Sequence, residues 1–333
     1  MKPRIIIDDN IPYISGRLEP VADITYVNQF GFTPELVHDA DALVIRTRTR
    51  CDSSLLSGTK VRMIATATIG TDHIDLAWCG NHNIRVSNAP GCNAPGVAQY
   101  VWSALLREGF DPTRHTLGVV GCGSVGSIVA LWGKLLGAEV LVSDPPRQRR
   151  GVIDNYAPLE RIMAECDAVT LHTPLTRSGA NPTFHLISGK EISSMKPGAI
   201  LVNAARGEVL DTVRALPLLR QKKIKTVIDT WEGEPEISSE LLDIADIATF
   251  HIAGYSRQGK ERAVSMVLTE LDDFFGFETD KSGLAPAYKF PETLSAQKII
   301  DSYDPFVDTH ALKINPQNFD LLRRDYLYRE EVN

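Results

Sequence analysis

Three polar residues of the second half of the chain, Arg206, Glu234 and His251, each follow a short apolar run that predicts a buried strand. Carboxyl ends of parallel strands border the ligand crevice of open α/β sheets. An arginine can clamp a carboxylate, a histidine can exchange a proton near neutral pH, and a carboxylate can orient that histidine. Taken singly, the favoured interpretations are a surface or capping arginine, a loop charge and a packed histidine, because most polar residues are not catalytic. Together they favour hydride transfer at a 2-hydroxy acid.

A glycine-rich motif, Gly121-Cys122-Gly123-Ser124-Val125-Gly126, lies between the strand predicted at 117–120 and an amphipathic helix. In this context the first glycine permits a tight turn, the second lets a pyrophosphate approach the backbone, and the third lets helix and strand pack closely. The N–H groups at the start of the helix then face the phosphates. The motif therefore predicts a dinucleotide-binding site.

Asp144 ends the next predicted strand, where a carboxylate can accept both ribose hydroxyls, and this favours NAD over NADP. The alternative is an aspartate that caps a turn or helix before Pro145. Arg147, Arg149 and Arg150 follow and could hold a 2′-phosphate. Because Asp144 would repel that phosphate, we interpret the arginines as a solvated or adenine-side cluster.

Arg46, Arg48 and Arg50 alternate with Thr47 and Thr49 directly after a predicted strand. If the strand continues, its period of two puts the arginines on one face. Three guanidinium groups at a crevice-facing strand end could bind a substrate phosphate. A solvent-exposed edge explains the row equally well.

Apolar runs alternate with helical patterns along most of the chain, which predicts α/β units with parallel strands. Strands are expected at 4–8, 23–27, 42–46, 61–66 and 84–87, then at 117–120, 139–143, 168–172, 199–203, 226–229 and 247–250. Helices are expected at 91–106 and 257–275. The six later strands predict a doubly wound sheet.

Several sequence motifs resemble those of the D-isomer-specific 2-hydroxyacid dehydrogenases. They include Asn203-Ala204-Ala205-Arg206-Gly207, Asp229-Thr230-Trp231-Glu232-Gly233-Glu234-Pro235 and His251-Ile252-Ala253-Gly254-Tyr255. The motifs at residues 65–73, 89–94, 143–147 and 172–175 are most similar to those of the branch of this family that acts on 4-phospho-D-erythronate. The resemblance implies oxidation of that acid at C2 to 3-hydroxy-2-oxo-4-phosphooxybutanoate with NAD, in pyridoxine and pyridoxal phosphate biosynthesis.

The resemblance also implies roles for single residues. Arg206, Glu234 and His251 form the catalytic set, and His251 is its acid and base. Besides the glycines of the glycine-rich motif (Gly121, Gly123 and Gly126), the implied NAD contacts are Ser124, Val125, Asp144, Thr173, Ala204, Ala205, Arg206, Asp229 and Gly254. Thr47, Thr68 and Tyr255 are the implied substrate contacts, to which the arginine row adds Arg46.

The implied fold is a Rossmann NAD-binding domain, residues 92–256, inserted into a flavodoxin-like substrate domain formed by residues 1–91 and 257–285. Residues 286–333 are interpreted as a C-terminal dimerisation segment, shorter than is usual in the family, in which residues 318–326 resemble part of the family's dimerisation region, and a homodimer is expected. Such a short segment is too small for a core of its own. We expect packing against another subunit to support it.

Some positions depart from the resemblance, and two rival functions remain. Gln99 and Ala205 replace a usual glutamate and cysteine, and Pro217 falls inside the helix expected at 211–220, which it should kink or end. One rival is a dehydrogenase of phosphoglycerate, hydroxypyruvate or glyoxylate, because the catalytic set is common to all of these. The other is a nucleotide-sensing, corepressor-like interaction protein.

Composition limits the remaining possibilities. The 333 residues carry a net charge of −7, which argues against nucleic acid as a partner. Five cysteines without zinc-like spacing predict free thiols, no metal and a reducing compartment. Because the chain has neither a signal peptide nor a long apolar stretch, we expect a cytoplasmic protein without membrane contact.

Overall fold

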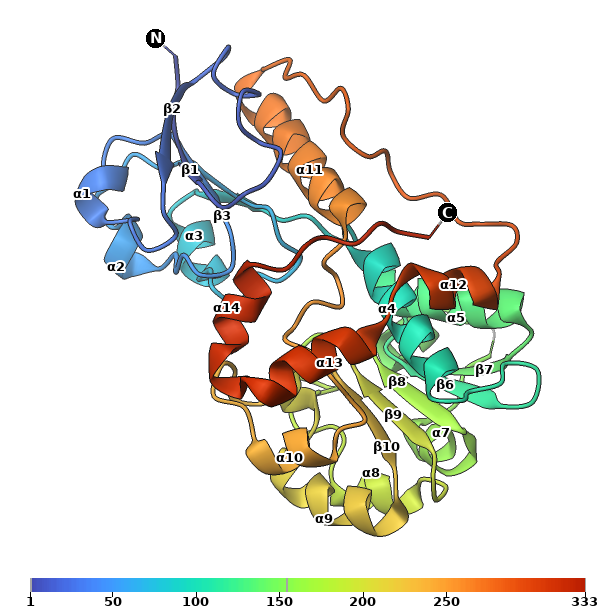
Figure 1. Ribbon diagram of the computed structural model, residues 1–333. Coiled ribbons are helices and arrows are strands. Elements are labelled where there is room, and N and C mark those ends of the chain that lie inside the picture. Colours follow the sequence, from blue (N-terminus) through green and yellow to red (C-terminus); the bar gives the residue numbers. More distant parts are fainter. Residues whose placement is uncertain (1, 154, 333) are drawn as a thin grey trace. The chain divides into compact units, whose positions relative to one another are not determined.

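The computed structural model describes residues 2–153 and 155–332 of the chain. They form two compact units, which interleave along the sequence (Figure 1). The first unit consists of Met1–Asn93 and Arg257–Tyr288, and the second of Ala94–Ser256 and Lys289–Asn333.

The first unit contains a five-stranded parallel sheet with strand order β2-β1-β3-β4-β5. The strands are β1 (Arg4–Asp8), β2 (Asp23–Val27), β3 (Ala42–Ile45), β4 (Met63–Thr66) and β5 (Arg85–Ser87). The helices are α1 (Pro34–Val37), α2 (Ser53–Leu56), α3 (Leu76–Asn81) and the long α11 (Arg257–Phe275). Side chains of α11 share one core cluster with the sheet, and those of the short helices share another, so the central strands are buried on both faces.

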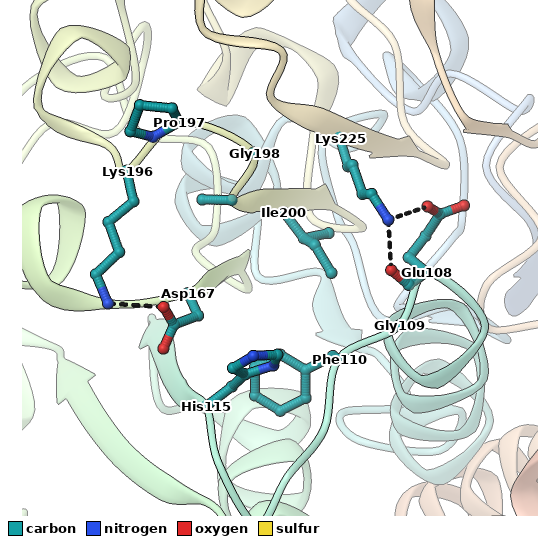
Figure 2. Close-up of a pocket in the computed structure, with 11 residues that line it drawn as sticks. Glu108, Gly109, Phe110, His115, Asp167, Lys196, Pro197, Gly198, Ile200 and Lys225 are labelled. Atoms are coloured by element: carbon teal, nitrogen blue, oxygen red, sulfur yellow. Dashed lines mark hydrogen bonds and ion pairs between the residues drawn. The ribbon is translucent and has the colours of Figure 1, made fainter.

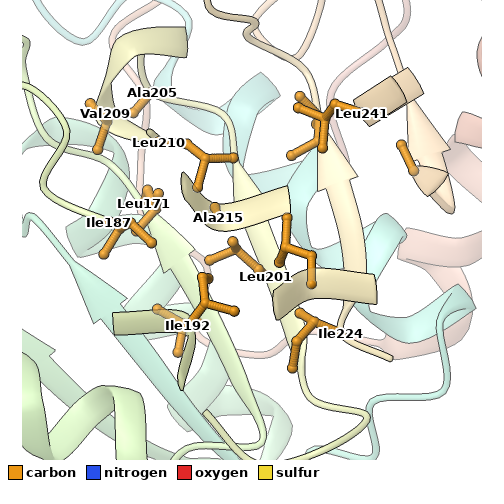
Figure 3. Packing of buried hydrophobic residues seen from close by; sticks show 14 of the residues in the cluster. Leu171, Ile187, Ile192, Leu201, Ala205, Val209, Leu210, Ala215, Ile224 and Leu241 are labelled. Atoms are coloured by element: carbon orange, nitrogen blue, oxygen red, sulfur yellow. The ribbon is translucent and has the colours of Figure 1, made fainter. Parts of the chain in front are cut away.

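The second unit contains a six-stranded parallel sheet with strand order β11-β10-β9-β8-β6-β7. The strands are β6 (Thr116–Val120), β7 (Glu139–Ser143), β8 (Ala168–Leu171), β9 (Ile200–Asn203), β10 (Lys225–Ile228) and β11 (Ile247–Ala248). Figure 3 shows the core on one face, where Leu171 and Leu201 of the sheet pack with Ile192 and Ala215 of covering helices. This sheet confirms the predicted doubly wound fold.

Helices and one 3₁₀ turn connect these strands. They are α4 (Ala94–Arg107), α5 (Ser124–Leu136), α6 (Pro145–Gln148), α7 (Leu159–Glu165), α8 (Gly189–Ser194), η1 (Gly207–Val209), α9 (Thr212–Lys222) and α10 (Ser239–Ile244). The prediction that Pro217 kinks or ends its helix is wrong about the ending, because α9 continues past it. Pro217 lies on the solvent side with Val213, so water can reach the carbonyl left without its N–H partner.

The C-terminal segment packs on the second unit of its own chain. The expected additional packing against another subunit stays a prediction. It contains α12 (Ala296–Ser302), α13 (Pro305–Ile314), η2 (Pro316–Asn318) and α14 (Phe319–Arg324). Helix α12 lies on α4 (Figure 1), and α13 packs against the edge strand β11. Leu312 and Phe319 are buried in the core of this unit. The Gln99 amide donates hydrogen bonds to the Ser302 hydroxyl (2.8 Å) and the Glu330 carbonyl (3.0 Å).

Candidate active site

The turn from β6 into α5 has the shape of a pyrophosphate cradle. Gly121 has φ 87°, and a Cβ there would lie 2.7 Å from the His172 carbonyl carbon. A Cβ on Gly126 would lie 1.9 Å from the Gly121 oxygen, so helix and strand touch there. A Cβ on Gly123 would meet nothing within 4 Å. Only the middle glycine faces open space, and α5 begins directly after it without a side-chain cap, which leaves N–H donors for a ligand.

Two residues beside this cradle fit a bound dinucleotide. The Asp144 carboxylate accepts hydrogen bonds from the Cys122 N–H (2.9 Å) and the Arg147 N–H (3.0 Å), so it also caps α6 as the alternative interpretation held. A carboxylate has further acceptor sites for ribose hydroxyls. The buried Thr173 hydroxyl has no hydrogen-bond partner among the described residues. A polar atom buried in this way calls for a ligand.

Neighbouring His172 is half-buried, and desolvation of its ring lowers its pKa to about 3. The Thr170 hydroxyl lies 2.9 Å from its Nε2. This histidine therefore stays neutral and supports the cradle without exchanging protons.

His251 and Glu234 form a histidine–carboxylate pair at the carboxyl edge of the same sheet. The His251 Nδ1 lies 2.8 Å from one Glu234 oxygen, and the other oxygen accepts from the Trp231 N–H at 2.8 Å. His251 has φ 60°, a left-handed backbone that a residue with a side chain seldom adopts. Since Nδ1 is bound to Glu234, Nε2 is left for proton exchange.

The electrostatics of Glu234 keep it ionised. Burial alone would raise its pKa, but the charge and hydrogen bond of His251, the Trp231 N–H and the charge of Arg323 together lower it below the usual value. An ionised Glu234 can orient the ring of His251 and stabilise its protonated form.

Asp229 fixes the loop that carries His251. Its two carboxylate oxygens accept from the N–H groups of Ile252 (2.8 Å) and Ala253 (3.0 Å), and the Thr249 hydroxyl also donates to it (2.7 Å). Its own carbonyl accepts from the His251 N–H at 2.8 Å. This residue was predicted only as an NAD contact, and the structure shows that it also anchors the loop that carries His251.

The loop with Arg206 packs against the loop with Glu234. The residue after Arg206 is Gly207, where a Cβ would lie 2.0 Å from the Trp231 carbonyl carbon. The Arg206 carbonyl accepts from the Asn203 amide at 3.1 Å. The three predicted catalytic residues thus belong to loops at one edge of one sheet, and His251 and Glu234 are in direct contact.

Arg323 of α14 is a residue that the sequence analysis missed. Its guanidinium donates to the Tyr255 hydroxyl at 3.1 Å and lies 5.8 Å from the centre of that ring. The C-terminal segment therefore brings a cation to a predicted substrate contact and to the surroundings of Glu234. The only sequence signal was the resemblance of residues 318–326 to the family.

The predicted substrate residues of the first unit follow β3 and β4. The strand continuation that would place Arg46, Arg48 and Arg50 on one face does not occur. Strand β3 ends at Ile45, and the chain turns so that the Thr49 N–H reaches the Arg46 carbonyl at 3.4 Å. A period of two therefore does not apply. The Arg46 guanidinium donates to the Asn10 carbonyl (2.8 Å), Thr47 is exposed, and the Thr68 hydroxyl lies 2.7 Å from that of Thr66.

A separate pocket of about 200 Å³ lies at the amino ends of the strands in the second unit (Figure 2). Its cations are already paired, Lys196 with Asp167 at 2.7 Å and Lys225 with Glu108 at 3.4 Å. It lies at the opposite edge of the sheet from the glycine-rich turn. We therefore do not assign the cofactor to this pocket.

Comparison with known proteins decides the family. Residues 95–254 match the model of the D-isomer specific 2-hydroxyacid dehydrogenase, NAD binding domain. An erythronate-4-phosphate dehydrogenase of Bacteroides fragilis is 46% identical, over 98% of this chain and 97% of that protein. The chain belongs to the erythronate-4-phosphate dehydrogenases. Family members from Porphyromonas gingivalis (38%, covering 99% and 94%) and Escherichia coli (39%, covering 98% and 92%) are also similar.

Solved structures show the same fold outside this family. An NAD-bound 3-phosphoglycerate dehydrogenase of Entamoeba histolytica superposes with a TM-score of 0.71 at 24% identity, covering 87% of this chain and 100% of that one. A D-lactate dehydrogenase of Aquifex aeolicus with NAD and lactic acid gives 0.66 at 23%, covering 82% and 96%. These structures show the fold that this chain shares, while the match of residues 95–254 to an NAD-binding domain and the dehydrogenase relatives make it an NAD-dependent oxidoreductase.

Proposed function

We propose that this chain oxidises 4-phospho-D-erythronate at C2 to 3-hydroxy-2-oxo-4-phosphooxybutanoate, a reaction of pyridoxal phosphate biosynthesis. The observation that carries the proposal is the 2.8 Å pair of His251 and Glu234 at the sheet edge that also carries the open glycine cradle. Identity of 46% to a named relative over nearly the full chain supports the substrate. A phosphoglycerate, hydroxypyruvate or glyoxylate dehydrogenase is the less favoured alternative.

NAD, when bound, supplies the hydride acceptor. Its contacts would be the turn at 121–126, Asp144 and Thr173, with Ala204, Ala205, Arg206, Asp229 and Gly254 from the later strand ends. His251 takes the hydroxyl proton at Nε2 as the substrate is oxidised and returns it in the reverse direction. Arg206 clamps the substrate carboxylate with its planar fork. Glu234 keeps the ring of His251 oriented.

Four residues are proposed to bind the rest of the substrate. Thr47, Thr68 and Tyr255 offer hydroxyl groups, and Arg46 offers a guanidinium for the phosphate. Replacing Arg46 with Gln is expected to raise KM for the phosphorylated acid far more than KM for an unphosphorylated 2-hydroxy acid.

The direct test compares kcat/KM for 4-phospho-D-erythronate, 3-phosphoglycerate and small 2-hydroxy acids with NAD, and repeats the preferred pair with NADP. An acceptor such as 2-oxoglutarate is added so that reduced cofactor held by the enzyme does not hide turnover. We expect 4-phospho-D-erythronate with NAD to be preferred. Preference for another acid would replace the substrate, and binding of NADH without any turnover would favour a nucleotide-sensing protein.

We further propose that the protein works as a homodimer in the cytoplasm. The C-terminal segment leaves apolar side chains exposed at Phe306, Val307, Ile314 and Leu327, as a subunit interface requires. The five cysteines are free thiols, as in proteins of a reducing compartment. Among the described residues, no helix is long and apolar enough to cross a bilayer.

A further inference from the structure

His185 lies between two carboxylates in the second unit. Its Nε2 is 2.7 Å from a Glu232 oxygen, and its Nδ1 is 3.5 Å from an Asp211 oxygen. Its backbone has φ 53°, in the left-handed region that is costly for a residue with a side chain. Strain of this kind persists only where the surroundings enforce it, and it gathers at functional sites.

The two carboxylates belong to two loops of the candidate active site. Glu232 lies in the loop after β10, two positions before Glu234. Asp211 ends the stretch after β9 that begins with Arg206, and it caps α9 through the Arg214 N–H at 3.1 Å. The ring of His185 therefore joins the loop of the carboxylate clamp to the loop that orients the acid/base.

Other contacts show that the two loops form one packed unit. The His185 N–H donates to the Glu208 carbonyl at 2.7 Å, and the second Glu232 oxygen accepts from the Thr212 N–H at 3.3 Å. Gly207 lies directly under the peptide after Trp231. His185 holds the outer half of the Glu234 loop, because among the described residues the Glu232 carboxylate has just one other hydrogen bond, the longer one from the Thr212 N–H.

We propose that His185 is a positioning residue for the oxidation: by holding Glu232 it keeps Glu234 in hydrogen-bonding register with His251. The inference rests on the proposed function. Without the ring, the partly exposed Glu232 turns to water and the loop gains freedom. A displacement of about 1 Å near reacting groups can cost up to a hundredfold in rate, so loss of one tether among several should cost about tenfold.

Substitutions at His185 separate positioning from folding. His185→Gly removes the ring but suits the positive φ, so the fold should lose little stability. His185→Gln places an amide N–H near the position of Nε2 and can still donate to Glu232, whereas the shorter side chain of His185→Asn cannot reach it. His38→Ala is a matched control, because His38 forms an exposed histidine–carboxylate pair (3.1 Å) with Asp39 in the first unit.

The full chain is assayed in single turnovers with NAD and the 2-hydroxy acid that the unmodified protein prefers. We expect His185→Gly and His185→Asn to slow hydride transfer about tenfold, His185→Gln to stay within about threefold of the unmodified rate, and His38→Ala to have no effect. The dissociation constant of NADH should not change. Amide hydrogen exchange at residues 231–234 should become faster in the Gly and Asn variants.

Unchanged transfer rates and unchanged exchange in His185→Gly would overturn the proposal. It would equally fail if the Gln variant were as slow as the Asn variant, or if NADH affinity fell in parallel with the rate. Failure of the proposed function looks different, because the unmodified protein would then reduce no NAD with any 2-hydroxy acid. In that case the exchange measurement still decides whether His185 holds the loop.

Discussion

At the scale of single residues, proton transfer depends on one ring held in one orientation. The left-handed backbone at His251 and the 2.8 Å bond from its Nδ1 to Glu234 leave Nε2 as the exchanging atom. The lowered pKa of Glu234 keeps this carboxylate ionised over a wide range of pH. Removal of the His251 ring should therefore lower turnover, whereas a change in the pKa of Glu234 should shift the pH profile of the activity.

Replacing His251 with Ala removes the acid/base. Turnover is expected to fall by about a hundredfold or more, the usual contribution of a positioned proton-transfer group. NADH affinity, measured by fluorescence titration, should stay close to that of the unmodified protein. An unchanged kcat would contradict the assignment.

Replacing Arg323 with Gln removes a cation that lowers the pKa of Glu234. The pKa of Glu234 then rises, so the carboxylate is protonated at a higher pH and the acidic limb of the kcat/KM profile moves to higher pH. Arg324→Gln is the matched control, since that exposed arginine pairs with Asp325 at 2.7 Å. A profile that moves equally in both variants, or to lower pH in Arg323→Gln, would contradict this account.

The shared location of the three proposed catalytic residues could be predicted because each follows a strand, and strand ends meet at one edge. Arg323 and His185 could not be predicted in the same way. Arg323 binds a tyrosine 68 positions away, and His185 binds a glutamate 47 positions away. Contacts over such separations depend on how whole segments pack, and the local pattern does not encode that.

At the scale of elements, the predictions depended on periodicity, and they failed where local geometry interrupted it. Buried parallel strands lie close to the predicted ranges because continuous β-branched apolar runs suit burial on both faces. The arginine row failed because β3 ends at Ile45 and the chain turns. Helix α9 continues past Pro217 because this residue lies on the side of the helix that faces water. Which side faces water is a property of the tertiary structure.

Gly207→Ala tests the packing between the loops of Arg206 and Glu234. Its Cβ would lie 2.0 Å from the Trp231 carbonyl carbon, so a backbone must move. We expect about 1–3 kcal/mol less stability against unfolding, and kcat/KM at least about tenfold lower because both loops shift. Gly80→Ala is the control, because a Cβ there meets nothing within 4 Å and helix α3 favours alanine. Full activity in Gly207→Ala would show that the loops do not need this contact.

At the scale of the whole molecule, the C-terminal segment belongs to the cofactor-binding unit. Arg329 donates to the carbonyls of Ile252, Ala253 and Gly96, so the end of the chain fastens the loop that follows His251. The sequence predicted a dimerisation segment too short for a core of its own, but it could not predict the packing on the second unit, because the partners lie far away in the sequence. Its outward side still exposes apolar residues.

Val307→Asp tests whether this exposed side forms the dimer. Val307 on α13 is 68% exposed, and a charge there should prevent burial in a subunit interface. We expect a dimer for the unmodified protein and a monomer for the variant in sedimentation velocity. Val213→Asp on α9, at a position 81% exposed, should remain dimeric. A Val307→Asp protein that stays dimeric would place the interface elsewhere.

The most direct test of the central claim follows deuterium from C2 of labelled 4-phospho-D-erythronate. The account predicts that the unmodified protein transfers this deuterium to NAD, and that His251→Ala does so about a hundredfold more slowly. Mass spectrometry of the reduced cofactor measures both rates. Oxidation of the substrate without deuterium in the cofactor, or no reaction with this substrate while another 2-hydroxy acid is oxidised, would contradict it.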